Sequence, residues 1–203
     1  MFEYQGLHIK IEKGVYEPSD DTYLLAENLK VKSEDVVLEL GTGSGLIALL
    51  AARTARKVVA TDISPIAVEC ASSNVSLNQL TNKVEIRLGN LFEPIREGEK
   101  FDLIIFNPPY LPENNKPSQN RSDWLGRAWD GGKSGRNLID PFIVNCKRYL
   151  NSAGLIQMVQ SSLSNISKSS QLFKMEGFHV EISAQKSFFF EKLVLLNGWL
   201  ENK

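Results

Sequence analysis

Residues 36–62 read VVLELGTGSGLIALLAARTARKVVATD, and this stretch decides the fold class. The apolar run at 36–40 predicts a buried strand, which the glycines of residues 41–45 bring to an end. Residues 46–54 then predict a helix, and residues 57–62 predict a second strand. Two short strands joined through a helix predict a parallel pair, because parallel neighbours need a crossover connection.

The same alternation continues along the chain. Helices are predicted at 65–77, 138–149 and 164–175, and further strands at 84–88, 101–106, 155–160, 180–184 and 193–196. The pattern predicts an α/β protein with a seven-stranded, mostly parallel sheet and helices on both faces. The last two strands have no helix-length segment between them, so we expect an antiparallel C-terminal hairpin at the sheet edge. Because the sequence has no repeat, linker or low-complexity tract, we expect a single domain over residues 1–203.

Composition and charge limit the classes of function. Of the 203 residues, 42% are hydrophobic and 23% are charged, which is typical of a globular protein. The 23 basic and 24 acidic residues give a net charge of −1, which disfavours a protein that holds nucleic acid by phosphate contacts alone. The purest apolar run, residues 46–52, is too short to span a membrane, and residues 1–4 do not begin a signal peptide. We therefore expect a cytoplasmic protein.

The glycine-rich turn is a candidate ligand site. Glycines at 41, 43 and 45 let the backbone pass close to a ligand at the start of a helix. A dinucleotide-binding turn would have its third glycine where this chain has Leu46, which disfavours a nicotinamide-dependent oxidoreductase. Asp62 ends the second strand, where a carboxylate can accept hydrogen bonds from both hydroxyls of a ribose. The turn alone is compatible with a structural role, but together with Asp62 it favours an adenosine-type ligand.

Residues 89–91, Gly-Asn-Leu, follow the third predicted strand and offer a place for the adenine ring. The Asn90 side-chain carbonyl can accept from an adenine amino group, and the Leu91 N–H can donate to a ring nitrogen. Because Gly-Asn is also common in ordinary turns, this pair is a weak indication by itself.

Asn107-Pro108-Pro109-Tyr110 ends the fourth predicted strand, at the edge where open α/β sheets bind ligands. The Asn107 side-chain carbonyl and the Pro108 backbone carbonyl can each accept one N–H of a planar amino or amide nitrogen. Neither proline has an N–H to compete for these acceptors, and Tyr110 offers a flat face for stacking. Such acceptors reduce lone-pair delocalisation and make the nitrogen a better nucleophile. An ordinary strand-ending turn is the alternative, which the neighbouring adenosine-type site disfavours.

These motifs together resemble the S-adenosylmethionine-dependent amino-methyltransferases. More narrowly, they resemble the HemK-type glutamine methyltransferases that modify class 1 peptide-chain release factors. Residues 16–22 (YEPSDDT) and 128–136 (AWDGGKSGR) are similar to segments of the short archaeal and eukaryotic branch. That branch lacks the bacterial N-terminal helical domain, and here only 38 residues precede Glu39. The resemblance implies a Rossmann-like class I methyltransferase fold with S-adenosyl-L-methionine as the cofactor.

The resemblance also implies which residues form the site. The catalytic residues are Asn107, Pro108 and Tyr110, and Pro109 joins them in binding the substrate. The residues that bind the cofactor lie in the N-terminal segment and at the strand ends: Thr22, Glu39, Gly41, Gly43, Asp62, Asn90, Leu91 and Asn107.

Within the cofactor site, the resemblance implies a place for each part of the ligand. Thr22 is expected near the methionine carboxylate, and Glu39 and Gly41 along the methionine and ribose. Asp62 is expected to hold the ribose, and Asn90 to lie beside the adenine. The family usually has Asp at the position of Asn90, so this chain offers an uncharged acceptor there.

The implied reaction is N5-methylation of the glutamine in a release factor's Gly-Gly-Gln motif. An adenine N6 or guanine N2 amino group in DNA or RNA is the main alternative, and a protein lysine is another. The nearly neutral charge disfavours nucleic acid, and a flexible, non-planar ammonium group disfavours lysine. The resemblance adds a small zinc-binding activator protein as a partner, which we expect at a sheet edge formed by the strand at 84–88.

Three other sets of residues have simpler interpretations. Cys70 and Cys146 are expected to be small buried side chains within helices, since their spacing suits neither a metal nor a disulfide framework. His8 and His179 are expected at surface or edge positions, so no metal site is expected. Phe188–Phe190 are expected to pack in the core and the C-terminal hairpin.

Overall fold

A computed structural model describes residues 1–112 and 124–200 of the chain. The strands of its main sheet are β3 (Val36–Leu40), β4 (Lys57–Asp62), β5 (Val84–Leu88), β6 (Phe101–Phe106), β7 (Leu150–Ser161), β8 (Phe178–Ser187) and β9 (Lys192–Leu200). The helices are α1 (Asp20–Glu27), α2 (Leu46–Ala52), α3 (Pro65–Leu77), α4 (Trp124–Arg127), α5 (Ile139–Cys146) and α6 (Ile166–Met175). A small separate hairpin consists of β1 (Phe2–Tyr4) and β2 (Leu7–Ile9).

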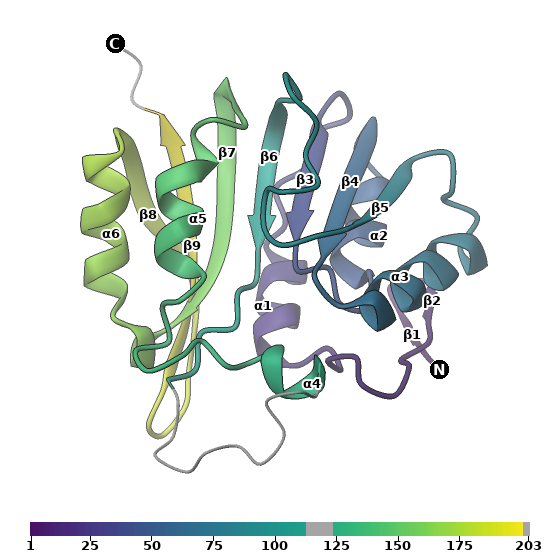
Figure 1. The fold of residues 1–203 in the computed structure, drawn as a ribbon, viewed down its shortest axis with the longest axis horizontal. Coiled ribbons are helices and arrows are strands. Elements are labelled where there is room, and N and C mark those ends of the chain that lie inside the picture. Colours follow the sequence, from purple (N-terminus) through teal and green to yellow (C-terminus); the bar gives the residue numbers. More distant parts are fainter. Residues whose placement is uncertain (113–123, 201–203) are drawn as a thin grey trace.

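Seven strands within the described residues form one sheet in the order β5-β4-β3-β6-β7-β9-β8 (Figure 1). The pairs β3–β4, β3–β6, β4–β5 and β6–β7 are parallel, whereas β9 is antiparallel to both β7 and β8. The mostly parallel α/β sheet and its antiparallel C-terminal hairpin are therefore confirmed. The strand predicted at 84–88 is β5, and it does lie at an edge of the sheet.

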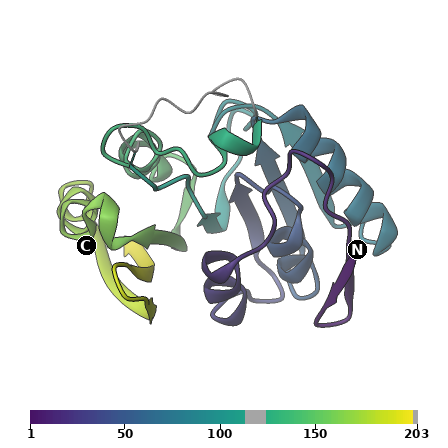
Figure 2. The ribbon, with the colours of Figure 1, turned by 90° about the horizontal axis from the view of Figure 1, so that it is seen from below.

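Alternating side chains divide the core into two layers, one on each face of the sheet. Along β6, Leu103 and Ile105 pack with α1 and α2, whereas Ile104 and Phe106 pack with α5 and α6. Figure 2 shows α1 and α2 on the opposite side of the sheet from α5. The central strands β3, β4 and β6 are thus buried on both faces, which is why they read as nearly continuous apolar runs in the sequence.

Several elements were not expected from the sequence. The strands β1 and β2 have only three residues each, too few for a recognisable alternation. The helix α1 buries Asp21 and Thr22 alongside its leucines, so its inward face does not read as apolar. The short helix α4 lies between β6 and α5, where the sequence pattern predicted neither a helix nor a strand.

The expectation that Phe188–Phe190 pack in the core is wrong. These residues form the turn between β8 and β9, closed by a 2.7 Å hydrogen bond from the Phe188 N–H to the Glu191 carbonyl. Their side chains are 40%, 92% and 86% exposed, because successive side chains in a tight turn diverge and no helix or strand of the described residues covers them. Cys70 and Cys146 are buried and free, as expected, and His8 and His179 are exposed. No helix in the described parts of the chain is long and apolar enough to cross a bilayer.

The strand order brings the predicted ligand-binding turns to one edge of the sheet. Leu40 at the end of β3 is level with Thr61 of β4 and with Phe106 of β6. Gly41 and Asn107, which follow β3 and β6, therefore meet Asp62, the last residue of β4, at the carboxyl ends of the strands. Chain connections from β3 and β6 lead to opposite faces of the sheet, and open α/β sheets bind their ligands in the crevice at such a point.

Candidate active site

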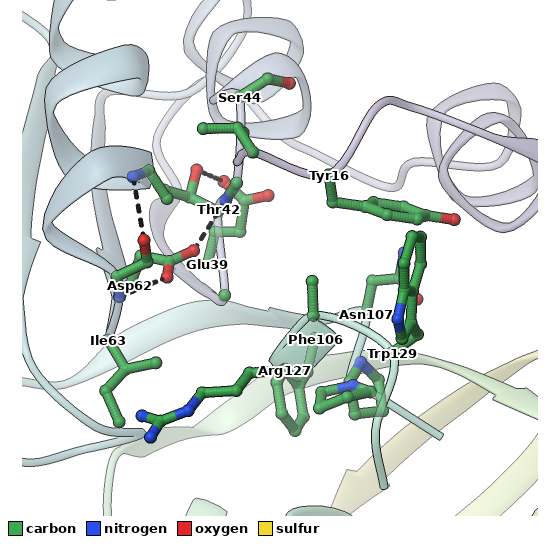
Figure 3. A pocket seen from close by; sticks show the side chains of 18 of the residues that line it. Tyr16, Glu39, Thr42, Ser44, Asp62, Ile63, Phe106, Asn107, Arg127 and Trp129 are labelled. Atoms are coloured by element: carbon green, nitrogen blue, oxygen red, sulfur yellow. Dashed lines mark hydrogen bonds between the residues drawn. The ribbon is translucent and has the colours of Figure 1, made fainter. Parts of the chain in front are cut away.

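One pocket lies at the carboxyl ends of β3, β4 and β6, and Figure 3 shows it from close by. Glu39 and Asp62 lie on one side of this view, and Asn107, Tyr16 and Trp129 lie on the other. Every site residue predicted from the sequence lines this pocket: Thr22, Glu39, Gly41, Gly43, Asp62, Asn90, Leu91, Asn107, Pro108, Pro109 and Tyr110. The structure therefore brings the whole predicted set together, while the role of each residue stays a prediction.

The turn between β3 and α2 brings the backbone close to the pocket. Gly41, Gly43 and Gly45 all have positive φ angles, of 66°, 54° and 83°. A Cβ at Gly45 would also lie only 3.2 Å from the Cβ of Ala71, so the turn packs tightly on α3. Glycine is needed here both for the left-handed backbone and for this close approach.

Asp62 is positioned by two backbone amides. Its two carboxylate oxygens accept hydrogen bonds from the Gly43 and Ser64 N–H groups, each at 2.9 Å. Burial raises the pKa of Asp62, although these hydrogen bonds oppose the shift. A carboxylate has about four lone-pair sites, so two bonds leave capacity for the hydroxyls of a ligand. The residue is therefore fixed in place and still able to hold a ribose.

Glu39 is a buried carboxylate directly beneath the glycine turn. It is only 4% exposed, and the Thr42 hydroxyl donates a 2.6 Å hydrogen bond to its Oε2 atom. Burial raises the pKa of Glu39 to about 8. A cationic or hydrogen-bond-donating ligand in the pocket would stabilise the charged form, which fits the aminoacyl end of S-adenosyl-L-methionine.

The raised pKa of Glu39 predicts how the stability of the cofactor-free protein depends on pH. The group favours its neutral form in the folded state, so its stabilising contribution is complete below its ordinary pKa of 4.5 and is lost as pH rises through about 8. We expect Glu39→Gln, which keeps an acceptor for Thr42, to gain stability relative to the wild type across this range. Urea unfolding of both proteins at the two ends of the range measures the difference. An equal difference at both pH values would contradict the assigned titration.

The loop after β5 closes the pocket beside Asp62. The Gly89 N–H donates to the Asp62 carbonyl at 2.9 Å, and the Asn90 N–H donates to Glu93 Oε2 at 3.2 Å. Leu91 has a φ of 46°, an unusual conformation for a branched side chain. These contacts place Asn90 and Leu91 next to the residue expected to hold the ribose, as an adenine site requires.

The Asn107-Pro108-Pro109-Tyr110 turn presents a free acceptor. Asn107 Oδ1 is buried and has no hydrogen-bond partner among the described residues. A buried polar atom without a partner is costly, so such an atom in a pocket indicates a donor that arrives with a ligand. The proline at each of the next two positions removes the backbone N–H groups nearest to this acceptor.

The phenol of Tyr110 is held by a residue that the sequence reasoning did not select. Its hydroxyl donates to Asp21 Oδ2 at 3.0 Å, and the Tyr16 hydroxyl donates to Asp21 Oδ1 at 3.1 Å. Asp21 also accepts the Thr22 N–H at 2.6 Å, so one buried carboxylate joins α1 to the catalytic turn. Burial and the Asp21 charge raise the pKa of Tyr110 far above its usual range. Tyr110 therefore stays protonated and presents its ring to the pocket without acting as a base.

The segment 128–136 folds back onto the catalytic turn. The Leu111 N–H donates to the Trp129 carbonyl at 3.1 Å, and the Gly131 N–H donates to the Leu111 carbonyl at 2.9 Å. A Cβ at Gly135 would overlap the Tyr110 carbonyl oxygen, so this glycine is needed for the approach. Trp129 lines the pocket and meets the ring of Tyr16 edge-on, with their centroids 5.7 Å apart. The only sequence signal for Tyr16, Asp21 and Trp129 was that their segments resemble those of a known family.

Comparison with known proteins gives a consistent result. Residues 7–121 match the family described as "Methyltransferase small domain". The chain is 41% identical over 201 residues to "Putative protein N5-glutamine methyltransferase MJ0928" of Methanocaldococcus jannaschii, with 98% of each chain covered. It is 31% identical to human "Methyltransferase HEMK2", with 80% of this chain and 79% of that protein covered. Among solved structures, the chain is similar to one in the E. cuniculi Mtq2–Trm112 complex, which is described as responsible for the methylation of the eRF1 translation termination factor. The two chains are 22% identical with a TM-score of 0.67, and the match covers 93% of this chain and 99% of that one.

The fold and the pocket define a Rossmann-like class I methyltransferase. Within that class, the chain belongs to the methyltransferase small domain family and to its HemK-type glutamine methyltransferases.

Proposed function

We propose that this enzyme transfers a methyl group from S-adenosyl-L-methionine to the side-chain amide nitrogen of a glutamine. The glutamine is that of the Gly-Gly-Gln motif in a class 1 peptide-chain release factor. Relatives named release factor glutamine methyltransferase support this substrate. One of them, from Clostridium acetobutylicum, is 34% identical over 196 residues, which cover 92% of this chain and 68% of that enzyme. The activity resides in a single domain over residues 1–203. The enzyme acts in the cytoplasm, where release factors act.

The buried, unpartnered Asn107 Oδ1 is the observation that carries the proposal. A primary amide has two N–H groups in one plane. Asn107 Oδ1 accepts one of them and the Pro108 carbonyl accepts the other, which fixes the nitrogen beside the turn after β3. The Tyr110 ring stacks on the amide plane, while Asp21 holds the phenol in place.

The pocket residues fit the proposed cofactor. Asp62 holds the ribose hydroxyls, Asn90 and Leu91 bracket the adenine, and Thr22 and Glu39 face the aminoacyl end. When bound, S-adenosyl-L-methionine supplies an electrophilic methyl group for an in-line displacement by the amide nitrogen.

Positioning supplies most of the catalysis. The carboxylate of Asp21 is occupied by two phenols and a backbone amide, and so does not serve as a general base. Correct alignment of two reacting groups is worth roughly 7–11 kcal/mol of barrier. The acceptors on Asn107 and Pro108 provide this alignment and favour a nitrogen lone pair that is less delocalised into the carbonyl.

A small zinc-binding activator protein is the proposed partner of this enzyme. The outer edge of β5 is unpaired in the sheet of the described residues, and Leu88 there is exposed. An unpaired strand edge is suited to pairing with a strand of another chain. The structurally similar Mtq2, which is named in a complex with Trm112, supports a partner of this kind.

The test is transfer of labelled methyl from S-adenosyl-L-methionine, with and without the activator protein. Parallel reactions contain the release factor, the same factor with the Gly-Gly-Gln glutamine changed to alanine, DNA, RNA and a lysine-rich protein. We expect label on the first substrate alone. Label on a nucleic acid or on lysine, with none on the release factor, would overturn the proposed substrate.

A further inference from the structure

The turn between β8 and β9 exposes three consecutive aromatic side chains. Phe189 and Phe190 are 92% and 86% exposed and meet each other edge-on, with ring centroids 4.5 Å apart. Phe188 is 40% exposed and lies under the Lys186 ammonium group. We call Phe188–Phe190 the aromatic tip. Large exposed aromatic side chains gathered in this way mark interaction sites more often than single exposed residues do.

The aromatic tip lies at the same edge of the sheet as the pocket. Ser161 at the carboxyl end of β7 pairs with Leu193 at the start of β9, so the turn extends beyond the strand ends where the pocket opens. Lys186 just before the tip forms a 2.7 Å ion pair with Asp20, the neighbour of Asp21. In Figure 1 the tip projects at the same end of the molecule as α4, whose Trp124 lines the pocket.

Glu191 directly follows the aromatic tip and closes the same turn. Burial and Asp21 are the main causes of the raised pKa of Tyr110, and the charge of Glu191 contributes as well. Glu191 Oε1 is itself buried without a hydrogen-bond partner in the described structure. A buried acceptor without a partner at the base of the aromatic tip is an atom that a donor of a bound partner can satisfy.

We propose that the aromatic tip is a docking surface for the folded protein substrate, contacting an apolar patch of the release factor next to the loop that carries the target glutamine. This inference rests on the proposed function and adds where the substrate is held. A single glutamine entering the pocket buries little surface, whereas aromatic anchors supply much of the affinity of protein interfaces.

Charge favours a protein over a nucleic acid as the occupant of this surface. Single-stranded nucleic acids also stack on aromatic side chains, but they require a positively charged groove along the backbone. Next to the tip, Lys186 is paired with Asp20, and the charge of Lys192 is balanced by the adjacent carboxylate of Glu191, so these residues leave no net positive charge there. An apolar protein surface fits this combination better than a phosphate backbone does.

The double variant Phe189→Ser/Phe190→Ser tests the docking surface. For the intact release factor, we expect KM to rise about tenfold or more, with kcat at saturation and the cofactor Kd unchanged. Turnover of a short Gly-Gly-Gln peptide, which is too small to reach the tip, should stay at the wild-type level. Met175→Ser is the matched control, because Met175 is 81% exposed at the far end of α6, and its KM should not change.

Each outcome gives a distinct answer. If the wild type methylates the release factor and the double variant has the same KM, the aromatic tip is not a docking surface, and the proposed function stands. An equal loss of activity on the peptide and on the intact factor would also overturn docking, since it would show damage to the pocket. If the wild type does not methylate the release factor, the proposed function fails, and the docking inference fails with it.

Discussion

Asn107→Ala is expected to lower the rate of methyl transfer by about 10²–10³-fold while the Kd for S-adenosyl-L-methionine stays within about threefold of the wild type. The side-chain oxygen of Asn107 is buried and has no partner among the described residues, so its removal breaks no hydrogen bond to that oxygen. Loss of this oxygen lowers the transfer rate because the substrate amide then has no acceptor in its place. Single-turnover rates at saturating cofactor, together with calorimetric titration of the cofactor, separate the two effects.

Asn145→Ala is a suitable control for that experiment. Asn145 is a partly buried asparagine on α5, and it donates a hydrogen bond to the Pro141 carbonyl away from the pocket. Its replacement should leave both the transfer rate and the cofactor Kd unchanged. If Asn107→Ala kept more than a tenth of the wild-type rate, Asn107 would not be the acceptor that orients the amide.

Asp62→Ala is expected to have the largest effect on cofactor binding. A hydrogen bond to a charged group is worth roughly 1.5–3 kcal/mol, so loss of the carboxylate should raise the cofactor Kd about 10- to 100-fold or more. At saturating cofactor, the transfer rate should recover most of its wild-type value, because Asp62 lies away from the acceptor nitrogen. Titration calorimetry and initial rates over a wide cofactor range measure both quantities.

The change also frees the Gly43 and Ser64 N–H groups, so a structural control is needed. Asp102 has a comparable role outside the pocket, since its carboxylate accepts the Val36 N–H at 2.9 Å. Asp102→Ala should lower the melting temperature without changing the cofactor Kd of the folded protein. If Asp62→Ala bound the cofactor as tightly as the wild type, Asp62 would not hold the ribose.

The central strands were predictable because their residues are buried on both faces. The runs at 36–40 and 101–106 are apolar for this reason, and their bounds agree with those of β3 and β6. The ends of these strands then located the glycine turn, Asp62 and Asn107 at a shared edge. The predicted positions of the strand ends therefore located most of the residues that line the pocket.

Other functional residues could not be predicted from the sequence, because their burial departs from the usual pattern. Asp21 is buried in order to hold two phenols, and a buried carboxylate on α1 breaks the apolar periodicity that identifies a helix face. The aromatic tip departs from the pattern in the opposite direction. Three consecutive phenylalanines predict core packing, but the turn between β8 and β9 exposes them. Departures of this kind from the burial pattern are expected where residues serve binding or catalysis.

The most direct test of the central claim is to locate the added methyl group by fragment mass spectrometry. The release factor is incubated with the enzyme and S-adenosyl-L-methionine, digested, and its Gly-Gly-Gln peptide is sequenced in the spectrometer. We expect one additional methyl group on the glutamine side chain with the wild-type enzyme and almost none with Asn107→Ala. A methyl group on any other residue, or an unmodified glutamine beside a methylated nucleic acid, would contradict this account.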